Sequence, residues 1–199
     1  LSAREGHRGL AGTADDYAFV VQGLLDLYEA DFDPAWLEWS LELMEALIEK
    51  FYDQGKGGFF MTASGEDRYL LLRLKEEADN VEPSASSVAV LNLIRLSQVT
   101  GRSDFRQKAD QTLSGFGMAL SQSPLSHPQM LAALDFALSP PRQIVIVGDR
   151  QAPQTQAMLR LVHRDFFQSL QFVSFPFPFS LEEAREQFVF SSLLASFRS

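Results

Sequence analysis

The chain has 199 residues, of which 46% are hydrophobic and 22% charged, a composition typical of a globular protein with a sizeable core. Its formal net charge of −9 argues against nucleic acid and anionic membrane surfaces as partners, because both require a basic face. The sequence contains no cysteine, which excludes disulfides, thiolate nucleophiles and thiol redox chemistry within these residues.

Apolar residues at helical spacing predict a first pair of helices joined by a tight turn. The first helix follows Thr13, which can cap it together with Asp16, and it runs to about Ala30. A second helix starts at Asp33-Pro34, where aspartate suits the cap and proline the first helical position, and it continues to about Phe51. The two helices should form an antiparallel hairpin.

A second pair of helices follows the same plan. Pro83 and Ser84 open its first helix, which stops at Thr100–Gly101, and Ser103 or Asp104 is predicted to cap its second helix. Because each pair is closed by a short turn, the first helices of the two pairs should run parallel. The long connection 52–83 then lies at their N-terminal ends.

The connection 52–83 and the C-terminal third contain the predicted β-structure. DQGKGG is a glycine-rich turn, and FFMT and RYLLLRL read as two short strands of a ribbon. After a helix from Pro128 to Leu138, a strand is predicted at Ile144–Val147 and a helix from Pro153 to about His163. We expect three segments: helical hairpins in 1–139, a small β-α end in 140–165, and an irregular Phe-rich tail in 166–199.

The N-termini of the two parallel helices and the long connection should gather acidic, basic, hydroxyl and aromatic side chains. Such a set could bind a sugar or perform acid–base chemistry. The competing interpretation is helix capping beside a solvated acidic loop, which accounts for the same residue types. If a site exists, the carboxylates of Asp16 and Asp79 should share a neighbour. The candidate ligand-binding residues are Asp16, Tyr17, Arg73, Asp79, Glu82, Ser84 and Ser86.

Other motifs carry weaker signals. His7, His127 and His163 lack metal-ligand spacing, so no metal site is predicted. IVIVGDR followed by a helix suggests half of a nucleotide-binding unit, but it lacks GxGxxG and a P-loop, and no cofactor is predicted. No apolar run approaches the roughly 18 residues that a membrane helix needs, so we expect a soluble protein.

Several ordered motifs within roughly residues 10–165 resemble one known family. They include DDYAFVVQGLLDLYEA, RLKEEADNVEPSASSVAVLNLIRLSQVTGR and QIVIVGD. The chain resembles the thioredoxin-domain proteins of the spermatogenesis-associated protein 20 family, which has bacterial YyaL-like members. The resemblance implies an N-terminal thioredoxin-like domain followed by an (α/α)6 toroid of the six-hairpin glycosidase type. This chain would be the C-terminal part of that toroid, a mainly α and incomplete ring with a short β-ribbon and a small α/β end.

The resemblance sets the functional expectations. The chain would belong to a protein linked to sperm development and fertility, as a carbohydrate-like binding or interaction module without catalysis of its own. The alternatives are part of an epimerase- or glycosidase-like enzyme, with Asp16 and Asp79 or Glu82 as acid and base, and a purely structural scaffold. The expected partners are the upstream hairpins and the thioredoxin-like domain. An intracellular location is favoured, and secretion is possible because the chain begins at Leu1 and looks like a fragment.

Overall fold

A computed structural model describes residues 3–4, 7–8, 12–64, 72–76, 78–140, 142–147, 149, 151–165 and 170–175. This part of the chain is mainly α-helical, as predicted, and none of its helices is long and apolar enough to cross a membrane. The helices are α1 (Ala14–Asp31), α2 (Pro34–Phe51), α3 (Ala85–Thr100), α4 (Ser103–Gln122), the 3-10 turn η1 (Pro124–Ser126), α5 (Pro128–Leu138) and α6 (Pro153–Asp165). The strands are β1 (Ala3–Arg4), β2 (His7–Arg8), β3 (Arg142–Val147) and β4 (Leu170–Phe175).

The starts of α1, α2 and α3 confirm the predicted caps. Thr13 and Asp16 form a capping box, in which the Thr13 N–H donates to Asp16 Oδ2 at 2.8 Å. Asp33 accepts from the Ala35 N–H, and Ser84 accepts from the N–H of Ser87. Local side chains therefore determine where these three helices begin.

The start of α4 corrects the predicted cap. Arg102 occupies the N-cap position without a side-chain cap bond, and Ser103 and Asp104 already lie in the helix. Gly101 ends α3 in the left-handed conformation, and only Gly101 and Arg102 separate the two helices. Asp104 binds Arg102 Nη2 at 2.7 Å, and this contact, followed by a second one with Glu45, raises the pKa of the guanidinium.

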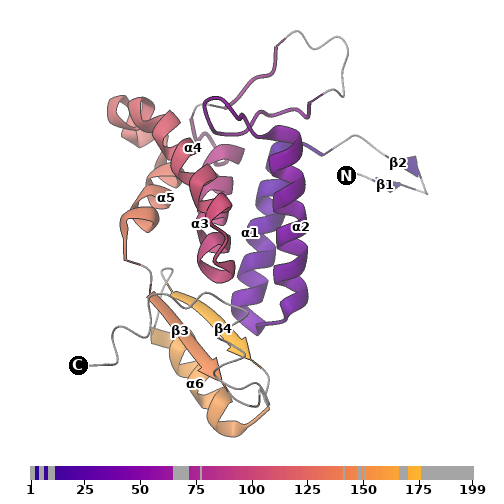
Figure 1. Cartoon of the computed structure of the whole chain (residues 1–199), viewed down its shortest axis with the longest axis vertical. Coiled ribbons are helices and arrows are strands. Elements are labelled where there is room, and N and C mark those ends of the chain that lie inside the picture. The colour runs from indigo at the N-terminus through magenta and orange to yellow at the C-terminus, as the bar shows by residue number, and fades with distance from the viewer. Residues whose placement is uncertain are drawn as a thin grey trace.

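The helices form antiparallel hairpins whose first members run parallel, as predicted. In Figure 1, α3 lies between α1 on one side and α4 and α5 on the other. Asn92 Nδ2 donates to the carbonyl of Ala18 at 2.9 Å, and further along both helices Arg95 binds Glu29 at 2.8 Å. Those two contacts fix the parallel direction of α1 and α3.

Helix α5 adds a third parallel member to this layer. At its start, the Asp79 carboxylate accepts hydrogen bonds from the N–H groups of both Ser84 and Gln129, so the beginnings of α3 and α5 lie together. At its end, Arg106 near the start of α4 donates to the carbonyl of Ala137. Helices α1, α3 and α5 therefore form one layer with a common direction.

Helix α3 is the centre of the core. Its residues are buried around almost the whole circumference, and Leu93, Ile94 and Leu96 are fully enclosed. Asn92 is also fully buried, and its Oδ1 has no hydrogen-bond partner in the described part of the chain. An interior helix of this kind is expected to be apolar on every side, so Asn92 is an exception.

The predicted ribbon in the connection 52–83 is not confirmed. None of the described residues of the connection lies in a strand; Tyr52 and Phe59 form an isolated bridge, and the Met61 N–H donates to the Leu74 carbonyl at 2.8 Å. Residues 68–71 of the predicted second strand lie outside the described residues.

The two ends of the chain differ from the predictions. Beyond Asp165 the sequence predicted irregular structure, whereas residues 170–175 form β4, parallel to β3. Phe-Pro alternation begins only after these residues, so nothing in 170–175 prevents a strand. Residues 3–4 and 7–8, which precede the first predicted helix, form two short antiparallel strands. The remainder of the Phe-rich tail lies outside the described residues.

Candidate functional site

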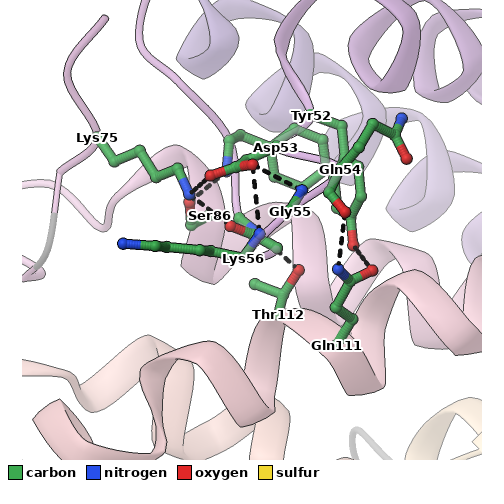
Figure 2. A network of polar contacts seen from close by, with 12 residues as sticks. Tyr52, Asp53, Gln54, Gly55, Lys56, Lys75, Ser86, Gln111 and Thr112 are labelled. Carbon is green, nitrogen blue, oxygen red and sulfur yellow. Dashed lines mark hydrogen bonds and ion pairs between the residues drawn. The ribbon is translucent and has the colours of Figure 1, made fainter.

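The glycine-rich turn that follows α2 is bound to both hairpins by a network of polar contacts (Figure 2). Lys75 Nζ donates to Asp53 Oδ2 at 2.5 Å and to the Gly57 carbonyl at 2.6 Å. The N–H of Gly58 donates to Thr112 Oγ1 on α4, and the N–H of Phe59 donates to the buried Ser86 Oγ on α3, both at 2.9 Å. The candidate Ser86 is therefore engaged by the backbone of this turn.

Two glycines explain why the turn can approach α4 so closely. Gly57 has a φ of 74°, and a Cβ there would lie 2.9 Å from backbone atoms of Thr112. On the helix, a Cβ at Gly115 would lie 2.4 Å from the Lys56 carbonyl oxygen. Backbone meets backbone at this contact, so the network is a structural clamp with little room for a ligand.

The Asp53–Lys75 ion pair makes the clamp sensitive to pH. The hydrogen bond from Lys75, with help from the Gly55 and Lys56 N–H groups, lowers the pKa of Asp53. Because the pKa of Asp53 is lower in the folded state, its ionised form stabilises the protein at pH values above the ordinary aspartate pKa of about 3.9. This stabilisation is lost as the pH falls through the pKa of Asp53 in the folded state. We expect Asp53→Asn to lower the free energy of unfolding by about 1–2 kcal/mol at pH 7. Urea unfolding at pH 7 and pH 3 measures the difference, which should shrink at pH 3; an equal loss at both values would contradict this role.

Two further candidates contact the C-terminal end of α2, Arg73 from the connection and Tyr17 from α1. Arg73 Nη2 donates to the carbonyls of Thr62 at 2.7 Å and Lys50 at 2.9 Å. The Tyr17 hydroxyl accepts from Lys50 Nζ at 3.2 Å, and its ring lies against Phe51. Both side chains are occupied by contacts that order this end of the hairpin.

Within the part of the chain that the structure describes, Asp16 and Asp79 share no hydrogen-bond partner. The Asp16 carboxylate binds Thr13 in the capping box. The Asp79 carboxylate binds backbone N–H groups of Ser84 at 2.9 Å, Gln129 at 2.9 Å and Met130 at 3.4 Å. The helix-capping interpretation therefore describes both residues, and it also describes Ser84, the N-cap of α3.

A small pocket of about 290 Å³ opens where α1 begins and the connection passes it, and Glu82 is among its lining residues. The neighbour of Asp16, Asp15, lines it as well. Partial burial raises the pKa of Asp15, and the carboxylates of Asp16 and Glu82 act in the same direction, while the Ala85 N–H opposes them. Asp15 is thus an acid whose protonated form is favoured by its surroundings in this pocket. Asp15 was not among the predicted ligand-binding residues, although it is the sequence neighbour of the candidate Asp16.

A larger groove of about 380 Å³ runs along the layer of parallel helices. Its floor comes from α3, and its two walls come from α1 and α5. Leu91 and Phe136 supply apolar surface. The polar lining residues are Gln22, Asp26, Glu29, Arg95, Gln129 and Asp135.

Arg95 organises the floor of the groove. Its side chain is only 10% exposed, and Nη2 lies 2.8 Å from both Asp26 Oδ1 and Glu29 Oε1. The sequence analysis missed this groove, although two signals were available. Arg95 is the only charged residue in the sequence of α3, and residues 22, 26 and 29 recur at the spacing of one helical face.

Comparison with known proteins identifies relatives of the chain. It is 44% identical over 152 residues to spermatogenesis-associated protein 20 of Homo sapiens, and 43% identical over 152 residues to the protein of the same name in Rattus norvegicus. The chain is homologous to spermatogenesis-associated protein 20. Each of these matches covers 76% of the chain and 19% of the relative, so the chain spans about a fifth of these proteins, a share consistent with their C-terminal part.

A more distant relative and the family models complete the comparison. An uncharacterized protein of Caenorhabditis elegans is 31% identical over 169 residues, which cover 85% of this chain and 23% of that protein. No protein-family model matches the chain. Homology to spermatogenesis-associated protein 20 thus agrees with the resemblance that the sequence motifs carried.

Proposed function

We propose that the groove between α1, α3 and α5 binds carbohydrate-like ligands, as part of a protein of sperm development and fertility related to spermatogenesis-associated protein 20. The groove's volume of about 380 Å³ carries the proposal, together with its mixed lining. Ligand pockets typically have a volume of roughly 300–1,000 Å³ and combine apolar surface with a few converging polar groups.

The lining residues have the chemistry that a polyhydroxylated ligand requires. Gln22 on α1 and Gln129 on α5 offer amide donors and acceptors from facing walls, and Asp135 offers carboxylate acceptors. Phe136 provides an apolar surface for the C–H face of a sugar ring. Such a set can bind several hydroxyl groups at once without a metal or cofactor.

Ligand titration of the full chain tests the proposal. We expect N-acetylglucosamine oligosaccharides to bind, and Gln129→Ala to weaken binding about tenfold, because one or two hydrogen bonds would be lost. Gln107→Ala is the matched control, since Gln107 is an exposed residue of α4 outside the groove. Isothermal titration calorimetry provides the affinities. Equal affinities of the two variants, or no binding by the wild type, would refute the assignment.

We also propose that α1, α3 and α5 form the inner layer of an (α/α)6 toroid. Their common direction supports this arrangement. Further support is the outward face of α1, where Phe19, Val20 and Leu27 are 36%, 45% and 47% exposed. Other hairpins of a longer protein would cover this apolar face. The thioredoxin-like domain is the second proposed partner.

The exposed face of α1 predicts how the isolated 199-residue chain behaves. We expect it to bind a hydrophobic dye such as ANS, and Leu27→Gln to reduce the dye fluorescence, because a polar residue then interrupts the apolar face. Met118→Gln, on α4 and also exposed, should have a smaller effect because it lies outside this face. A sharp cooperative melt of the isolated chain without dye binding would show that no further hairpins are needed.

An epimerase- or glycosidase-like activity is the second candidate function, and Asp15 favours it. A carboxyl with a raised pKa beside Glu82 in a pocket is a suitable general acid. In this assignment Asp15 replaces Asp16 in the predicted acid–base pair of Asp16 with Asp79 or Glu82, and Glu82 is retained. In assays of sugar turnover on the full chain, Asp15→Asn should abolish product formation and leave binding in the groove intact; turnover that survives the change would exclude Asp15.

A further inference from the structure

The charge of the groove lining limits which sugars it accepts. Asp26, Glu29 and Asp135 contribute three carboxylates, and Arg95 contributes one guanidinium, so these side chains carry a net charge of −2 at neutral pH. A charge of this size at the wall of a groove acts directly on any charged ligand group. This step rests on the proposed sugar site.

Arg95 does not compensate for this charge toward a ligand. Its Nη2 is held at 2.8 Å by Asp26 and at 2.8 Å by Glu29, and the side chain is 10% exposed. A guanidinium that serves as an anion receptor must present its donors to the ligand. Here Nη2 is directed at two carboxylates of the protein. Asp135, on the opposite wall, is an exposed residue.

We infer that the groove prefers amino sugars, whose ammonium groups carry positive charge, over neutral N-acetylated sugars, and that it rejects acidic sugars. An ammonium group within a few ångströms of Asp135 gains an ion pair that an N-acetyl group lacks. A uronate or sialate carboxylate would instead approach three carboxylates of like charge. The groove therefore discriminates sugars by charge as well as by their hydroxyl groups.

Three tetrasaccharides test the inference on the full chain: the glucosamine tetramer, its fully N-acetylated form and tetragalacturonate. In calorimetric titrations at pH 6 and low salt, the glucosamine tetramer should bind roughly three- to tenfold more tightly than the acetylated form. This ratio should fall at 200 mM salt, since salt screens charges on a partly open surface. Tetragalacturonate should not bind.

A pair of variants distinguishes the effect of the charges in the groove from the effect of the net charge of the whole chain. The whole chain has a net charge of −9 and would attract any cation weakly. Asp135→Asn in the groove should lower the ratio of the two affinities at least threefold, whereas Asp110→Asn on α4, which removes the same charge elsewhere, should leave it unchanged. An unchanged ratio in Asp135→Asn, or binding of tetragalacturonate, overturns the inference and leaves the sugar site standing. Failure of all three sugars to bind overturns both.

Discussion

Replacing Gly115 by alanine should lower the free energy of unfolding by about 1–3 kcal/mol, the typical cost of overpacking a close contact. Alanine normally stabilises the interior of a helix relative to glycine. At Gly115, however, the added Cβ would lie 2.4 Å from the Lys56 carbonyl oxygen. This neighbour is backbone of the glycine-rich turn, so the turn must move away from α4, and the clamp between Lys75, Asp53 and Gly57 would loosen with it.

Gly117 provides a matched control on the same helix. A Cβ at Gly117 meets no atom within 4 Å, so Gly117→Ala should raise the free energy of unfolding by about 0.5–1 kcal/mol. Urea denaturation of both variants gives the comparison. If Gly115→Ala is as stable as Gly117→Ala, then the turn does not lie against α4 as described.

Asp79→Ala should destabilise the protein by about 2–3 kcal/mol, because one carboxylate caps α5 and also supports the start of α3. Its Oδ2 accepts from the N–H groups of Gln129 and Met130, in the first turn of α5, and its Oδ1 accepts from Ser84. His127, at the N-cap position of α5, makes no side-chain cap bond. Loss of a helix cap costs about 0.5–2 kcal/mol, and an unsatisfied N–H beside it adds to this.

Thermal unfolding should show the effect of Asp79→Ala as a fall in Tm of roughly 4–12 °C, since 1 kcal/mol shifts Tm by about 2–4 °C at this chain length. Asp79→Asn, which keeps one acceptor oxygen, should lose about half as much. Glu82→Ala is the control: Glu82 is exposed and three residues away, so its removal should change stability by less than about 0.5 kcal/mol. If Asp79→Ala behaves like Glu82→Ala, the capping role is wrong.

Helix boundaries were predictable where the signal is local. Thr13, Asp33, Ser84 and Gly101 act on atoms within a few residues along the chain, and each appears at the expected helix end. The cap of α5 was not predictable in this way, because it comes from Asp79, 50 residues before Gln129. The ribbon in 52–83 was predicted from β-forming residues, which indicate pairing between two strands of the connection. In the structure, the backbone of Gly58 and Phe59 bonds to side chains of α4 and α3.

The candidate site illustrates the limit of reasoning from residue types. Parallel helices correctly brought Asp16, Asp79 and Ser84 to one end of the molecule, but caps and functional acids use the same side chains, and their hydrogen bonds are those of caps. Asp15 and Asp16 are neighbours in the sequence, so their side chains lie about 100° apart around the helix. This difference in direction decides that Asp15, and not Asp16, lines the pocket. The groove depends on α5, whose placement against α3 no local pattern encodes.

The buried Asn92 has a consequence for how α3 is oriented about its own axis. A helix that is apolar on every side could turn within its surroundings at little cost, because each orientation buries similar surface. The Asn92 amide has one satisfied orientation, in which Nδ2 reaches the Ala18 carbonyl at 2.9 Å. In any other, this donor would also be buried without a partner, at a cost of about 1–3 kcal/mol. Asn92 thus favours one rotation of α3 about its axis, much as a single buried asparagine selects one register in a coiled coil, and in this rotation Arg95 faces Asp26 and Glu29.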